Sequence, residues 1–167
     1  EINEASSGFN NNFEKYYHNE HDVVIDSSSA LMWVDDVFWK EIPFLEAVEE
    51  VNSFNQSKYA GYSDWRLPTL KEALTLMEPK SDYDESYIDD ILRFFTNRTI
   101  WTSDFNEVII FEEVRTDYNP RTGEVLSNKK HKIKKLDMWV ANFKYGSYSS
   151  VFADSTSSCY LGIVRSF

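Results

Sequence analysis

The densest cluster of one chemical group in the chain is a run of lysines at residues 129–135. The run reads Lys-Lys-His-Lys-Ile-Lys-Lys and holds five lysines and no acid. If it forms a β-strand, alternation places Lys130, Lys132 and Lys134 on one face. Such a row suits a sulfated or acidic ligand held by point charges, and added salt should weaken that binding. A lysine-rich edge strand that prevents aggregation is the alternative interpretation.

A second candidate site lies later in the chain, where the sequence is rich in Tyr, Ser and Asn. This mixture is typical of recognition surfaces, because a tyrosine ring gives a broad contact at low entropic cost while Ser and Asn adapt their hydrogen bonds. We predict that the rings contact a ligand and that the polar groups orient it. The predicted residues are Asn142, Lys144, Tyr145, Tyr148, Asp154 and Tyr160. An ordinary turn-rich hairpin is the alternative.

Patterns for catalysis or metal binding are weak. His18 and His21 lie close to acidic residues but fit no zinc spacing, and the acidic residues of 82–90 lack the EF-hand order and its central glycine. Cys159 is the single cysteine, so an internal disulfide and Cys-pair chemistry are excluded. The chain has no glycine-rich phosphate loop and no HExxH helix. We therefore expect no cofactor, no metal and no enzymatic activity.

Length and charge narrow the function further. The 167 residues fit one domain, and 42% hydrophobic residues are enough for a core. The net charge of -11 disfavours binding to a phosphate backbone, so no nucleic-acid partner is expected. No run approaches the roughly 18 apolar residues of a membrane helix. We therefore predict no transmembrane segment.

The elements that position these residues follow from periodicity. Alternating residues predict a hairpin over 22–34 around a serine turn, and apolar spacings of three and four predict a helix from Pro43 to Phe54. Thr69 and Glu72 form the capping-box pattern for a second helix, which we expect Pro79 to end.

The remainder of the chain is mostly strand-like. Short helical turns are expected within 88–95, and β-strands within 100–164, with a hairpin loop at Asn119–Gly123 in an extended excursion. Residues 1–21 read as a lead-in segment, and 22–167 as the domain. Two helices followed by a sheet indicate an α+β fold.

One sequence block resembles a known family. Ala60-Gly-Tyr-Ser-Asp-Trp-Arg-Leu-Pro-Thr69, with Asp26–Trp33 and Phe44–Ala47 before it and Ile100–Ser103 and Ile163–Arg165 after it, is similar to the bacterial Lcl C-terminal domain family. The resemblance implies a C-type-lectin-like fold, in which two helices flank a twisted antiparallel sheet. It also implies a bacterial surface or secreted protein, since the founding member resembles an adhesin that engages sulfated glycosaminoglycans.

The block itself is better explained as architecture than as a binding site. We expect Trp65 and Leu67 to point inward, and Arg66 to stack on a ring or pair with Asp64. Gly61 suits a left-handed turn. The tryptophans of the apolar strands are expected in the core; they are Trp33, Trp101 and Trp139.

The sequence thus favours a non-catalytic, extracytoplasmic recognition domain that binds a glycan, sulfated glycans included, or a protein. The alternative is a structural module that contacts neighbouring domains or copies of itself as a homo-oligomer. A hydrolase is the least favoured reading, because the abundant carboxylates show no specific spacing.

Overall fold

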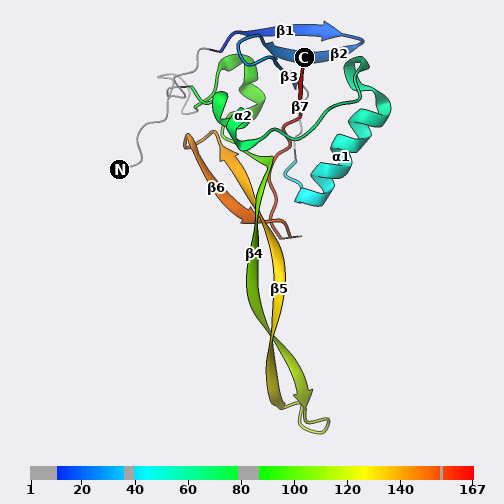
Figure 1. Ribbon diagram of the computed structural model, residues 1–167, viewed down its shortest axis with the longest axis vertical. Helices are drawn as coiled ribbons and strands as arrows, with labels where there is room; N and C mark the ends of the chain where they lie inside the picture. The colour runs from blue at the N-terminus through cyan, green and yellow to red at the C-terminus, as the bar shows by residue number, and fades with distance from the viewer. Residues whose placement is uncertain (1–10, 36–39, 79–86, 155) are drawn as a thin grey trace.

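Two antiparallel sheets and two α-helices make up the computed structural model, which describes residues 11–35, 40–78, 87–154 and 156–167 (Figure 1). The strands are β1 (Phe13–His18), β2 (His21–Asp26), β3 (Leu31–Val34), β4 (Thr99–Tyr118), β5 (Val125–Asn142), β6 (Ser147–Phe152) and β7 (Val164–Ser166). The helices are α1 (Phe44–Ser57) and α2 (Leu70–Thr75), with 3-10 turns η1 (Tyr59–Gly61) and η2 (Asp90–Phe95). The α+β prediction is confirmed, although the strands form two sheets where the sequence predicted one.

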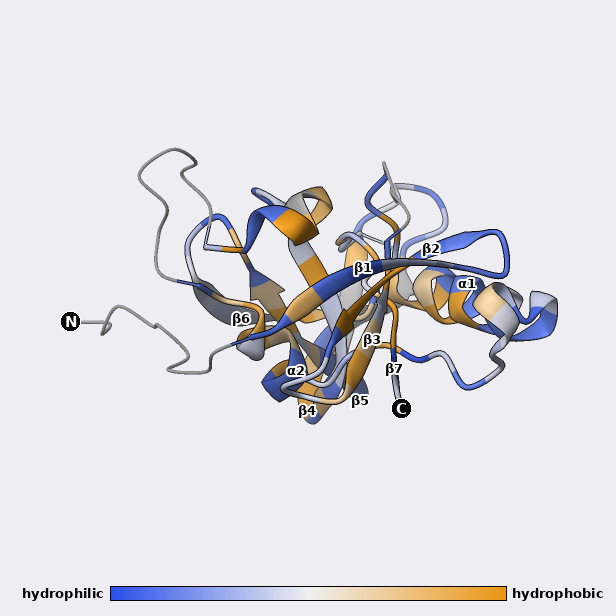
Figure 2. Cartoon of the chain, turned by 90° about the horizontal axis from the view of Figure 1, so that it is seen from above, coloured by the Kyte–Doolittle hydropathy of each residue, from blue (hydrophilic) through white to orange (hydrophobic). Residues whose placement is uncertain are grey.

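The first sheet has the order β1-β2-β3-β7. The predicted hairpin over 22–34 is confirmed as β2 and β3. Its polar turn is held by the buried Asp26, whose carboxylate accepts hydrogen bonds from the Ser28 backbone N–H (3.0 Å) and the Ser29 hydroxyl (2.5 Å). β1 pairs with β2 at the outer edge and is mostly hydrophilic (Figure 2). Part of the predicted lead-in is therefore a strand; residues 1–10 lie outside the described residues.

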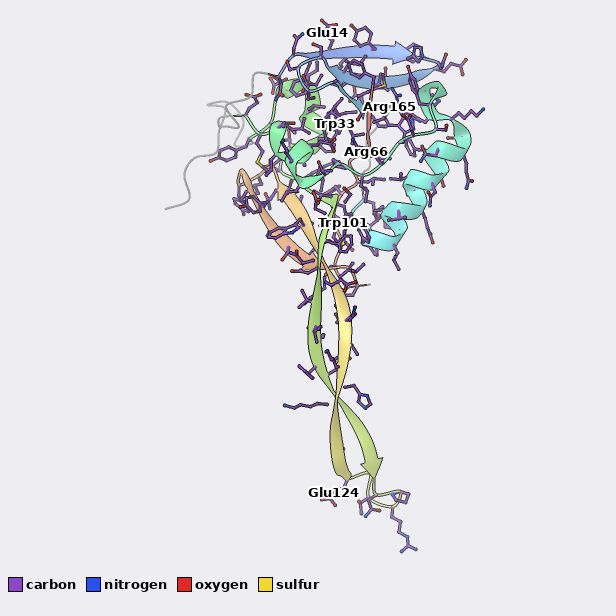
Figure 3. The ribbon with its side chains drawn as sticks, viewed as in Figure 1. Glu14, Trp33, Arg66, Trp101, Glu124 and Arg165 are labelled. Carbon is purple, nitrogen blue, oxygen red and sulfur yellow. The ribbon has the colours of Figure 1, made fainter. Side chains whose placement is uncertain are left out.

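The second sheet has the order β4-β5-β6 and contains a long hairpin. β4 and β5 are 20 and 18 residues long, and their far end turns at Asn119–Glu124. The predicted hairpin loop is confirmed. β6 pairs with β5 only between Asp137 and Asn142, so the rest of the hairpin extends from the body as a two-stranded arm, here residues 105–137 (Figure 1). Figure 3 shows Trp101 at its root and Glu124 at its tip.

Both predicted helices are present. α1 follows Pro43, whose fixed φ suits a helix start, and it buries Ala47 and Val51. α2 begins with a complete capping box, in which Thr69 and Glu72 bond to each other's backbone N–H groups. The prediction that Pro79 ends α2 is wrong, because the helix ends at Thr75 and the chain turns before the proline.

The block at residues 60–69 joins α1, α2 and the last strand. Trp65 and Leu67 are buried, and Gly61 has a φ of 83°, as predicted. Arg66 makes a bidentate ion pair with Glu72, with both N–O distances 2.7 Å. The expected pairing of Arg66 with Asp64 is therefore wrong. Asp64 instead accepts hydrogen bonds from Arg165, whose guanidinium lies 3.8 Å from the centre of the Tyr62 ring.

The core forms two clusters, one containing Trp101 and the other Trp33. Trp101 packs edge-on against Phe44, and its Nε1 donates to the Ile42 carbonyl at 2.8 Å. Trp33 packs edge-on against Phe95. These clusters fix the position of the second sheet on the body, because the root of β4 and β5 contributes side chains to both.

Candidate functional site

The candidate site is an exposed aromatic surface on β5 and β6. In the register of this pair, Trp139 lies opposite Ser150, so its side chain shares a face with Tyr148 and Phe152, two residues to either side of Ser150. On the other face of the pair, Met138 and Val140 of β5 belong to the core. We call the surface formed by Trp139, Tyr148 and Phe152 the aromatic face.

The rings of the aromatic face are held in a defined arrangement. The Trp139 and Tyr148 ring centres are 5.7 Å apart with planes inclined by 62°, an edge-to-face contact. Trp139 is half-buried, whereas Tyr148 and Phe152 are exposed. Such rings present flat apolar surface to the solvent without the entropic cost of ordering a long flexible side chain.

Polar groups border these rings. The Ser150 hydroxyl donates to a carboxylate oxygen of Asp137 at 2.8 Å, on the same face of the sheet. Lys135 Nζ lies 5.5 Å from the centre of the Phe152 ring and 3.9 Å from a carboxylate oxygen of Asp154. Donors and acceptors of both charges therefore surround an apolar patch, which is the combination that a hydroxyl-rich ring requires.

The predicted residues of the β5–β6 turn have different roles. Asn142 accepts hydrogen bonds from the backbone N–H groups of Lys144 (3.0 Å) and Tyr145 (3.1 Å), so its side chain shapes the turn. The exposed Tyr145 ring lies 5.3 Å from Lys144 Nζ. Tyr148 follows the turn on β6, so Lys144, Tyr145 and Tyr148 lie near one another.

Asp154 and Tyr160 are held by their own surroundings. The carboxylate of Asp154 accepts from the hydroxyl and backbone N–H of Thr156 and from the Ser157 N–H, and the pKa of Asp154 is lowered chiefly by the hydrogen bonds from Thr156. The Tyr160 ring packs on the second core cluster, with the Arg98 guanidinium 4.3 Å from its centre. Both residues shape the loop that follows β6, and Tyr160 is only partly accessible.

The lysine row is not part of the aromatic face. Residues 129–135 do lie in a strand, as the sequence allowed, but alternation along β5 places Lys130, Lys132 and Lys134 on the face opposite Trp139. Lys134 Nζ is 3.0 Å from a carboxylate oxygen of Glu107 on β4, and Lys135 Nζ is 3.6 Å from Glu112. Part of the lysine charge is thus balanced across the hairpin, a pairing that the sequence reasoning missed because it did not place residues 107–112 beside the lysines.

Sequence reasoning also missed Trp139 and Phe152. The expectation that Trp139 lies in the core with Trp33 and Trp101 is wrong, since only the latter two are fully buried. A signal for this was present in the sequence: Asp137 precedes Trp139 by two residues, and both therefore share one face of a strand.

The two histidines and the cysteine weighed for metal binding or catalysis pack against aromatic rings or are buried. His18 stacks against Tyr62, and His21 lies 3.9 Å from Tyr59 between ring centres. Burial, with Glu41 nearby, raises the pKa of Cys159 to about 12. Among the described residues, no group of three or more His, Cys, Asp or Glu side chains is placed to hold a metal ion. The acidic residues at 82–86 lie outside the described residues.

The family model of the Lcl C-terminal domain matches residues 22–165 of this chain, nearly its full length. The chain belongs to the Lcl C-terminal domain family. No curated protein and no solved structure matches the chain significantly. In this Lcl C-terminal domain the family-like block at residues 60–69 builds the frame, and the aromatic face lies outside it. Within the described part of the chain, no helix combines the length and the apolar character needed to cross a membrane.

Proposed function

We propose that this Lcl C-terminal domain is a non-catalytic recognition module of a bacterial surface or secreted protein, and that it binds a saccharide on the aromatic face. The observation that carries the proposal is the half-buried Trp139 ring beside the exposed Tyr148 and Phe152, bordered by Asp137 and Ser150. A sugar ring has one face of C–H groups and an edge of hydroxyls. The aromatic rings suit the first, and the carboxylate, hydroxyl and ammonium groups suit the second.

The proposal of a binding role without catalysis is supported by the chemistry of the residues. Cys159 is buried and its pKa is raised to about 12, so its thiol stays protonated at neutral pH and is a poor nucleophile. The Asp137 carboxylate accepts from Ser150, and Asp154 is engaged by three donor groups of its own loop. These acids are arranged to hold structure and to accept hydrogen bonds.

Family membership supports the extracytoplasmic location and a C-type-lectin-like origin of the fold. The return of β7 to pair with β3 agrees with such an origin, because it brings the late chain back to an early strand.

The test is a glycan array followed by calorimetric titration of the saccharides that bind. We expect Tyr148→Ala to weaken binding by about tenfold or more, since truncating a central aromatic contact typically costs over 1 kcal/mol. Tyr17→Ala is the matched control, because Tyr17 is an exposed tyrosine (72% against 57% for Tyr148) on the unrelated strand β1. Equal binding by the Tyr148→Ala and wild-type domains would overturn the assignment of this face.

Sulfated and neutral saccharides on the same array separate the two predicted sites. A variant with Lys130, Lys132 and Lys134 changed to Gln should lose sulfated ligands only, if the lysine row binds them. Retention of all ligands by this variant would reject the lysine row and leave the aromatic face as the site. Capture of a protein but no saccharide would favour the protein-ligand alternative.

A further inference from the structure

The arm at residues 105–137 is a two-stranded ribbon that leaves the body (Figures 1 and 3). From Leu136 outward, β5 has β4 as its only strand partner among the described residues. Isolated two-stranded hairpins are marginally stable in water unless one face packs on something else. The arm therefore has a physical reason to bind another surface.

Among the arm side chains that the structure describes, the large exposed apolar ones form a stripe along one face. Phe105 pairs with Met138, Ile109 with Lys134 and Phe111 with Lys132 in the hairpin register. These are alternate positions on both strands, so their side chains point the same way. The exposed fractions on this face are 53% for Phe105, 47% for Ile109, 66% for Phe111 and 40% for Leu136.

The stripe continues into a groove at the base of the arm. The groove, with a volume of about 400 Å³, lies between α1 and the hairpin. Phe44 and Val48 line it from α1, while Phe105, Leu136 and Met138 line it from the hairpin. Phe105 and Leu136 belong to both features, so the groove and the stripe are one surface, on the side of the sheet opposite the aromatic face. This surface is largely apolar, and the ion pair of Lys134 with Glu107 lies within it.

The charges along this surface change sign from the tip to the base. Residues 105–137 carry seven Lys or Arg and six Asp or Glu, whereas the rest of the chain carries ten and 22. Near the outer end, Lys130 and Lys132 share the face with Phe111. Arg66 lines the groove, and its charge is balanced by the ion pair with Glu72. At the rim, Asp104 lies between the lining residues Ser103 and Phe105, and Glu49 follows Val48 on α1; both acids are exposed.

We propose that this apolar surface is an interface between two copies of the chain, in which Phe111 of each copy enters the groove of the other. Six residues separate Phe105 from Phe111, a distance of about 20 Å along a strand. Two arms packed antiparallel place the basic outer end of each beside the acidic rim of its partner's groove, with Ile109 near the centre. The contact is the same in both directions, so it closes as a two-fold dimer.

Sedimentation velocity over a series of protein concentrations tests the interface. We expect the wild-type chain to dimerise and Phe111→Gln to weaken the dimer by about tenfold or more, because a buried aromatic anchor is lost. Phe167→Gln is the matched control, since Phe167 is 58% exposed and lies outside the arm. Lys132→Glu should also weaken the dimer, by placing an acid against the acids Asp104 and Glu49 at the groove rim.

Disulfide trapping between two different variants identifies the contact directly. Chains carrying Phe111→Cys are mixed with chains carrying Val48→Cys, and oxidation should yield the mixed dimer. Cys159 is buried with a raised pKa and contributes little background. Tyr17→Cys replaces Val48→Cys in the control, where no mixed dimer is expected.

The outcomes separate this interface from the proposed saccharide site. Tyr148→Ala should leave the dimer unchanged, because Tyr148 lies on the opposite face. A chain that stays monomeric up to millimolar concentration overturns the proposal. A dimer that is insensitive to Phe111→Gln, or that gives no mixed disulfide, overturns it as well, since the copies would then meet elsewhere.

Discussion

The same two strands, β4 and β5, occupy two contrasting environments. At their root, Ile100 and Trp101 pair with Ala141 and Val140, and all four residues are buried between the two core clusters. Further out, Ile109 pairs with Lys134, and both side chains face the solvent. Backbone pairing is continuous apart from local register shifts, so hydrogen bonding does not distinguish the root from the arm. Packing against the body is what should make the root stable and leave the outer arm dependent on a partner.

Removing a root side chain should have the largest effect. Trp101→Ala deletes the packing against Phe44 and the hydrogen bond to the Ile42 carbonyl, and we expect a loss of about 3–5 kcal/mol of unfolding free energy. Chemical denaturation measures it. Phe111→Ala, at a concentration where the chain is monomeric, should change that free energy by no more than about 0.5 kcal/mol. Similar losses for both variants would remove the distinction between root and arm.

The next largest effect is expected at the start of α2. Glu72 completes the capping box and pairs with Arg66 through two contacts of 2.7 Å. Glu72→Ala should therefore cost about 1–3 kcal/mol of unfolding free energy. Glu49→Ala, an exposed helix position on α1, is the control and should stay within about 0.5 kcal/mol at a concentration where the chain is monomeric. If Glu72→Ala matched this control, the ion pair would contribute nothing measurable.

Acid should weaken the body through the same contacts. Burial raises the pKa of Glu72, but hydrogen bonds from Arg66 and Thr69 outweigh it, so the net pKa lies below the ordinary 4.5. The hydrogen bond from Arg165 lowers the pKa of Asp64 below 3.8. The unfolded state thus binds more protons, and this stabilisation is complete above the ordinary pKa values and is lost as the pH falls through the lowered ones.

Urea unfolding from neutral to acidic pH measures this loss. We expect the midpoint to fall below about pH 4.5, and to fall less steeply in Glu72→Gln, which has no carboxyl at that position. Since Asp64 is more than half exposed, solvent screens its pair and its share should be the smaller one. Parallel pH profiles of the variant and the wild-type chain would contradict this assignment to Glu72.

The smallest effect is expected within the arm. Lys134 and Glu107 are both mostly exposed, so a double-mutant cycle with Lys134→Gln and Glu107→Gln should give a coupling of no more than about 0.5 kcal/mol. The same cycle on Arg66 and Glu72 should give a larger value, because both groups are partly buried and bidentate. A stronger coupling in the arm would show that it is more rigid than its solvation implies.

The helices and the first hairpin could be predicted from sequence because their signals are local. Pro43, the Thr69–Glu72 capping box and the serine turn after Asp26 each act within a few residues. The end of α2 was predicted too late in the chain. A proline marks a position beyond which a helix cannot continue, but the helix can end before it.

Features that depend on distant partners could not be predicted in this way. Arg66 had two nearby acids, and only the folded arrangement of α2 and β7 selects Glu72 for Arg66 and Asp64 for Arg165. Trp139 has an apolar neighbourhood in sequence, but its exposure depends on which face of β5 the body covers. The sequence predicted the arm only as an extended excursion. The pairing of β4 glutamates with β5 lysines depends on the hairpin register, and local sequence patterns do not give that register.

The pairing of β3 with β7 has a consequence for how the chain reaches its native state. Trp33 is aligned with Val164, so the first sheet gains its last strand only through a contact between residues far apart in the sequence. During synthesis, β7 follows every other strand, whereas β4 and β5 can pair as soon as both have emerged. Long-range contacts of this kind slow folding, so the arm should zip early and the closure of the first sheet should limit the overall rate.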